Sequence, residues 1–115
     1  MKIGGIKPIA LLVLGYCIET ARKESMPEIW TNLKEVEATL NRYISMKALP
    51  LNLSPGHISA SFLMLEGGYI SIERDSQEQG RNLERPFKVR VNPSGKAYYE
   101  RLKEEIGYEP SGITG

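Results

Sequence analysis

LSPGHISASFLMLEGGYISIE, residues 53–73, changes its hydrophobic period from that of a helix to that of a strand. Ser54 is a favourable N-cap, and Pro55 suits the first helical position because a helix start leaves that N–H unbonded anyway. One apolar stripe follows at helical spacing, formed by Ile58, Phe62 and Leu65. The sequence therefore predicts a short helix over residues 54–66.

Two glycines end this helix, and a strand follows them. Gly67 and Gly68 would cost about 2 kcal/mol inside a helix, but they suit the left-handed turn that ends one. Over residues 69–73 the period falls to two, with Ile70 and Ile72 on one face. A capped helix that runs through a glycine turn into a strand is the shape of a recognition helix followed by a wing.

Two segments resemble the winged helix-turn-helix of PadR-like and MarR-like transcription regulators. The first is LSPGHISASFLMLEGGYIS, with a Ser-Pro-Gly helix start, a hydrophobic stripe and a Leu-Glu…Gly-hydrophobic-Ile exit. The second is RPFKVRVNPSGKAYYERL, residues 85–102, which resembles the returning wing strand and the start of the family's last helix. There Asn92 and Lys96 stand in the Thr and Arg places of a Thr-x-x-Gly-Arg pattern. The resemblance implies a DNA-binding regulator of a usually dimeric kind.

We therefore expect an α+β, mostly helical fold: a winged helix-turn-helix with four helices and a small antiparallel β-hairpin wing. The helices are predicted at about 6–23, 27–45, 54–66 and 93–106, and the wing strands at about 69–73 and 87–91. In the second strand, period two turns Phe87 and Val89 inward and Lys88 and Arg90 outward. Residues 1–106 are expected to form one winged-helix domain. Because Gly107 ends the last helix, residues 107–115 are expected to be a flexible tail.

The second helix is predicted from a start signal and a heptad repeat. Ser25-Met26-Pro27-Glu28 matches a capping box with proline at the first helical position, so the helix is expected to begin at Pro27. Its apolar positions are Ile29, Leu33, Val36, Leu40 and Tyr43. The following turn, residues 45–53, is longer than the usual three or four residues, and its alternating leucines are a candidate strand that pairs with the wing.

The first helix is apolar on every side from Ile9 to Ile18, so it must be covered on every side. We expect one face to pack on the domain core and the other on a second subunit, giving a homodimer through helix 1 and the C-terminal helix. The alternative is a central helix wrapped by the second and last helices. Ten apolar residues are too few for a bilayer, which needs about 20.

Composition narrows the class of protein. With 115 residues, 41% hydrophobic and 25% charged, the chain suits one compact domain. One cysteine and one histidine exclude a disulfide framework and a Cys/His zinc site, so we expect a cytoplasmic protein without a cofactor. No nucleophile with a base and no phosphate loop is present, so no enzyme is expected. Cys17 is expected to be a buried small hydrophobe, with a redox sensor as the alternative.

A DNA-binding surface follows from the helix at 54–66, which would enter the major groove by its N-terminal turns. Its readers would be His57, Ser59, Ala60 and Leu63. Phosphate contacts are expected from Arg74, Arg81, Arg85, Lys88 and Arg90 on the wing and Lys47 in the turn. Without Arg, Asn or Gln on the helix, shape readout and phosphate contacts are expected to supply much of the affinity. The alternatives are an exposed or capping role for His57 and a solvated hairpin face for the wing cations.

These observations predict a small homodimeric transcriptional regulator that binds double-stranded DNA. One alternative is an architectural or plasmid-partition adaptor that coats DNA with little sequence preference. The other is a winged-helix protein-interaction module, which the near-neutral net charge of +1 and the apolar Leu63 and Met64 would suit.

Overall fold

The computed structural model describes residues 5–74 and 83–115, and within them it contains four helices and a three-stranded antiparallel sheet. In chain order the elements are α1 (Ile6–Glu24), β1 (Ile29–Thr31), α2 (Leu33–Met46), α3 (Pro55–Leu65), β2 (Ile70–Arg74), β3 (Phe87–Val91) and α4 (Pro93–Ile106). The predicted α+β, mostly helical class is confirmed, and the sheet has one strand more than the predicted hairpin.

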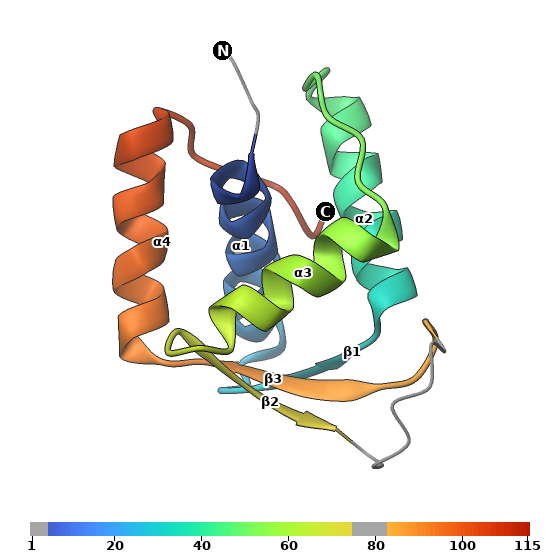
Figure 1. Cartoon of the computed structure of the whole chain (residues 1–115), viewed down its shortest axis with the longest axis vertical. Coiled ribbons are helices and arrows are strands. Elements are labelled where there is room, and N and C mark those ends of the chain that lie inside the picture. Colours follow the sequence, from blue (N-terminus) through green and yellow to red (C-terminus); the bar gives the residue numbers. More distant parts are fainter. Residues whose placement is uncertain (1–4, 75–82) are drawn as a thin grey trace.

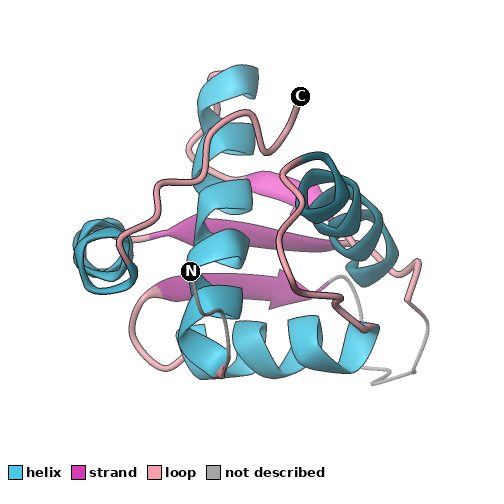
Figure 2. Cartoon of the chain, turned by 90° about the horizontal axis from the view of Figure 1, so that it is seen from above, coloured by secondary structure: helices cyan, strands magenta, loops and turns pink. Residues whose placement is uncertain are grey.

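The helices lie over one face of the sheet (Figure 1), and the view from above shows the three strands side by side (Figure 2). The strand order is β1-β3-β2, and Val89 in the central strand lies opposite Ile29 on one side and Ile72 on the other. The ring of Phe87 packs edge-on against Phe62 of α3, with centroids 5.3 Å apart. This inner face of the sheet therefore faces the helices, as its apolar alternation requires.

The predicted start of the second helix at Pro27 is wrong, because residues 29–31 form β1 and α2 begins at Leu33. Ser25 does not cap a new helix; it ends α1 in the left-handed conformation, with φ 54°. Asn32 is the true N-cap, and its side chain accepts the Glu35 N–H at 2.7 Å. The β-branched Ile29 and Thr31 turn inward and pair with β3, which completes the sheet.

The candidate strand in the turn is also wrong, since residues 49–53 form no strand. Their alternation has another cause: Leu49 and Leu51 are half-buried and Leu53 is buried against the core. The edge of β3 that such a strand would have used is occupied by β1.

α1 is the central helix of the structure, enclosed by the chain itself. Every residue from Ala10 to Cys17 is buried, and α1 packs against α2, α3, α4 and the sheet (Figure 1). At its sheet end, the Tyr16 and Thr31 hydroxyls share a buried hydrogen bond of 2.8 Å. The central-helix alternative accounts for the apolar surface, so that surface gives no argument for a second subunit.

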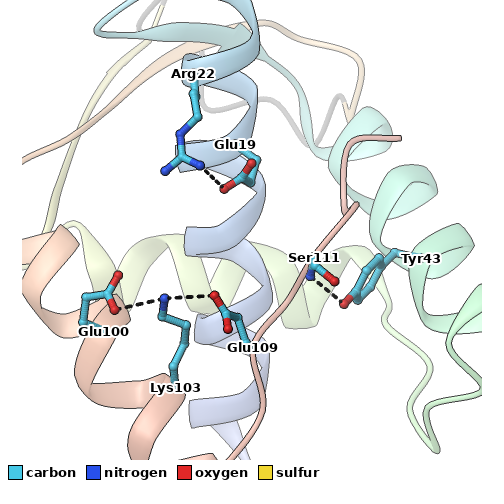
Figure 3. A network of polar contacts seen from close by, with 7 residues as sticks. All are labelled: Glu19, Arg22, Tyr43, Glu100, Lys103, Glu109 and Ser111. Atoms are coloured by element: carbon cyan, nitrogen blue, oxygen red, sulfur yellow. Dashed lines mark hydrogen bonds and ion pairs between the residues drawn. The ribbon is translucent and has the colours of Figure 1, made fainter.

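The C-terminal segment, predicted to be a flexible tail, is packed in the structure. From the end of α4 it runs across α1 towards α2 (Figure 1), and Ile113 is only 1% exposed. The Ser111 N–H donates to the Tyr43 hydroxyl at 3.2 Å, and Lys103 bridges Glu100 and Glu109 (Figure 3). The prediction failed because the spacing of apolar residues in the tail does not indicate a buried side chain, yet Ile113 fills a position in the core.

Candidate nucleic-acid interface

α3 begins with a reciprocal capping box. The Ser54 hydroxyl accepts the His57 N–H at 3.3 Å, and His57 Nδ1 accepts the Ser54 N–H at 3.1 Å. A neutral imidazole that accepts at Nδ1 carries its proton on Nε2. The sequence left a capping role and a DNA contact as alternatives for His57, and this geometry allows both, because the exposed imidazole keeps an Nε2–H donor.

The two sides of α3 differ completely in exposure. Ile58, Ser61, Phe62 and Leu65 are buried against α1, α2 and the sheet. The four predicted readers, His57, Ser59, Ala60 and Leu63, are all exposed, and Leu63 is 71% exposed. The structure therefore places these four residues on one open helical surface, and α3 carries no charged side chain.

Asn41 of α2 fixes the start of α3, and sequence reasoning did not find it. Its side-chain amide donates to the Leu53 carbonyl and its oxygen accepts the Leu53 N–H, both at 2.9 Å. These two bonds hold the residue that precedes the Ser54 cap, so they set where α3 begins. An asparagine inside a helix is unfavourable by propensity, which is the only signal that the sequence offers for such a role.

The other end of α3 is tied to the start of α4. The Asn92 side chain donates to the Gly68 carbonyl at 3.0 Å and accepts the Gly95 N–H at 2.9 Å. Its backbone N–H donates to the Tyr69 carbonyl at 3.1 Å. Asn92 thus caps α4 and also fixes the glycine turn between α3 and the wing.

The wing cation Arg74 lies beside the C-terminal end of α3. It lies on the helix-facing side of β2, and its guanidinium makes two bonds to the Glu66 carboxylate, at 3.3 and 3.4 Å. Glu66 is the C-cap of α3, so this pair joins the C-terminal end of α3 to β2. The pairing neutralises a charge that was predicted to contact phosphate.

Lys88 and Arg90 project from the sheet face that is turned away from the helices. Lys88 lies between Glu73 and Glu28, at 3.2 and 3.5 Å, and over the ring of the exposed Trp30. Its hydrogen bond to Glu73 raises the pKa of Lys88. Arg90 is exposed on the same outer face, opposite Ser71. The structure thus separates these two cations from the α3 surface.

The remaining predicted cations occupy three different places. Lys47 is exposed at the C-cap of α2, with Nζ 5.9 Å from the centre of the Tyr43 ring. Arg85 is half-buried in the chain that enters β3, and Arg81 lies outside the described residues. Just before Arg85, Leu83 and Glu84 are held on the start of α2: the Lys34 N–H donates to the Leu83 carbonyl, and its ammonium pairs with Glu84 at 2.8 Å. This arm of the hairpin therefore packs against α2.

Cys17 is buried in the middle of the fold. It is 2% exposed, and burial raises the pKa of its thiol to about 12. A redox sensor needs an accessible thiolate, so the environment of Cys17 matches the buried-hydrophobe prediction. In the described part of the chain, no group of three or more His, Cys, Asp or Glu residues is placed to hold a metal ion.

This burial predicts a loss of stability at high pH. The ordinary thiol pKa is 9.0, so between pH 9 and 12 the unfolded chain releases the Cys17 proton while the folded chain keeps it. The free energy of unfolding should fall by about 1.4 kcal/mol per pH unit in this window from this group alone. Urea unfolding of wild type and Cys17→Ala at pH 8 and 11 measures the effect. An equal decline in both proteins would contradict it.

A two-helix unit with an exposed second helix, followed by an antiparallel hairpin in a three-stranded sheet, defines a winged-helix fold. The chain is similar to the solved structure of a transcriptional regulator from Clostridium thermocellum, with a TM-score of 0.57. The identity is 21%, and the match covers 86% of this chain and 80% of the other. No family model matches the sequence, and no curated protein does. None of the helices in the described part of the chain contains an apolar stretch of the length that a bilayer span requires.

Proposed function

We propose that this protein is a transcriptional regulator that binds double-stranded DNA with the exposed surface of α3. The observation that carries the proposal is that surface itself: four residues, His57, Ser59, Ala60 and Leu63, point away from the core on a helix fixed at both ends. A helix of this width fits the major groove, and the adjoining hairpin would lie along the backbone. The similarity to a transcriptional regulator supports the same function.

The electrostatics favour moderate, shape-dependent binding. The net charge is +1, and two wing cations are paired, Arg74 with Glu66 and Lys88 with Glu73. Few phosphates would therefore be neutralised, so the affinity should fall less steeply with salt than that of a strongly basic protein. The pair between Arg74 and Glu66 can open in favour of a phosphate, because both side chains reach solvent.

A homodimer is part of the proposal. One helix without a bidentate side chain discriminates weakly between base pairs, and a second copy on the same duplex would double the contacts. Because the middle of α1 is enclosed, an interface would use its exposed N-terminal end and α4. These ends are neighbours: Lys7 pairs with Glu105 at 3.0 Å, and Ile6 beside it is 45% exposed.

The PadR-like and MarR-like affiliation and the cytoplasmic location are proposed on the sequence resemblance and composition alone. The residues that carry the resemblance have structural roles here, since Ser54 caps α3 and Asn92 caps α4. This agreement supports a common winged-helix plan.

The test is selection of tight-binding duplexes from a random pool, followed by titrations of selected and random duplexes at low and moderate salt. A regulator should prefer the selected duplex by well over tenfold, and the half-sites of a dimer should repeat at about 34–36 Å. Equal affinity for both duplexes would contradict the regulator and favour the architectural or partition adaptor. No binding at micromolar protein in low salt would contradict DNA binding and favour the protein-interaction module.

A further inference from the structure

The open surface of α3 has an unusual chemistry for a helix in the major groove. Pro55–Leu65 contains no charged side chain and no Asn or Gln, so no side chain on it can make a bidentate contact to a base. What it presents instead is apolar: Ala60 and Leu63 are three residues apart, so they are neighbours on one side of the helix.

Small residues lie one turn before and one turn after this apolar pair. Gly56 precedes Ala60 by four residues, Gly67 follows Leu63 by four, and both glycines are exposed. With no side chain at either place, the backbone can approach a groove floor closely, and Leu63 is an exposed large apolar side chain between them. Its 71% exposure leaves most of the side chain available for contact.

The apolar group that DNA presents in the major groove is the C5 methyl of thymine, and 5-methylcytosine presents the same group. We infer that α3 selects duplexes by these pyrimidine methyl groups, through Leu63 and Ala60. The inference rests on the proposed function. His57 Nε2–H and the Ser59 hydroxyl then supply hydrogen bonds to phosphates or purine acceptors, which orient the helix without reading the methyl.

The size of the patch favours DNA over a protein partner. A stable protein interface buries roughly 800 Å² on each side, and one leucine with one alanine supplies a small part of that area. The patch also lies between His57, whose Nδ1 accepts the Ser54 N–H so that its Nε2–H remains as a donor, and Arg74 near the far end of α3. The Nε2–H suits a phosphate oxygen, and the Arg74 guanidinium would suit one once its pair with Glu66 opens. A methyl group in a groove bordered by phosphates matches this arrangement.

The test compares duplexes that differ only in the methyl group. A duplex chosen by selection is synthesised with thymine, and again with deoxyuridine at every thymine position, which keeps every phosphate and every hydrogen-bonding group. Burial of one methyl group is worth about fourfold in affinity, and of two about fifteenfold. The uracil duplex should bind weaker by that factor.

Two variants assign the effect to the helix. Leu63→Ala removes most of the exposed apolar side chain and should bring the thymine-to-uracil affinity ratio down towards one. Met26→Ala is the matched control, because Met26 is 54% exposed and lies outside α3; its ratio should equal that of wild type. Circular dichroism before each titration establishes that both variants are folded.

The outcomes separate the inference from the function beneath it. Equal affinity of wild type for the thymine and uracil duplexes would overturn methyl selection and leave DNA binding intact. A thymine preference that survives in Leu63→Ala would overturn the assignment to α3. Binding to neither duplex would overturn the proposed function and the inference with it, and would leave the α3 surface to a protein partner.

Discussion

Gly95→Ala is expected to lower the free energy of unfolding by about 3 kcal/mol, a large effect for the addition of one methyl group. A Cβ at this position would lie 2.2 Å from the Tyr69 carbonyl oxygen and 2.8 Å from Val91 Cγ1. The oxygen belongs to the backbone and accepts the Asn92 N–H, so it can move only if this hydrogen bond between the start of α4 and the start of the wing breaks. In an open helical site the same change would be stabilising, because alanine favours helix.

Urea unfolding followed by circular dichroism measures this change, with Gly56→Ala as the matched control. The nearest atom to a Cβ at Gly56 is the Ser54 hydroxyl oxygen at 3.7 Å, an ordinary contact. Gly56→Ala should therefore equal wild type or exceed it by up to about 1 kcal/mol. If Gly95→Ala proved as stable as wild type, the close packing of α4 on the start of β2 would be wrong.

Local signals predicted the parts of the fold that depend on neighbours in sequence. Ser54 and Pro55 start α3, Asn92 starts α4 and Gly107 ends it, as their capping chemistry requires. The exposure of the four proposed readers on α3 was also predicted correctly, because a helical stripe that is buried fixes the opposite side as open.

β1 was missed because two local signals competed. Ser25 to Glu28 has the pattern of a capping box, and the heptad spacing continued through Ile29 into α2. In the structure, the helix starts instead at Asn32, whose side chain accepts the Glu35 N–H. Ile29 and Thr31 pair with β3, and no local pattern in the sequence reveals this pairing. A strand of three residues leaves too short an alternation to be recognised.

The wing cations show what period two can and cannot predict. It predicted that the side chains of Lys88 and Arg90 lie on the other face of β3 from those of Phe87 and Val89, and they do. It could not predict that the outward face is the one turned away from α3, because that depends on which side of the sheet the helices cover. Ion pairs between distant residues, such as Arg74 with Glu66, are likewise fixed only by the tertiary fold.

Leu63→Glu is expected to weaken binding to duplex DNA by at least about thirtyfold, or about 2 kcal/mol. The change replaces an exposed apolar contact by a carboxylate on a helix that would face phosphates and base edges, where like charges cost several kcal/mol. Because the Leu63 side chain is 71% exposed, stability should change by less than about 0.5 kcal/mol. Met26→Glu, which changes the net charge by the same amount outside α3, is the control.

Fluorescence-anisotropy titration of a selected duplex with wild type, Leu63→Glu and Met26→Glu tests directly whether α3 is the DNA-binding surface. The expected result is binding by wild type and by Met26→Glu within about threefold of each other, with Leu63→Glu weaker by thirtyfold or more at the same salt concentration. Equal affinity of all three proteins would place DNA elsewhere on the molecule, and a wild type that binds no duplex would contradict the account as a whole.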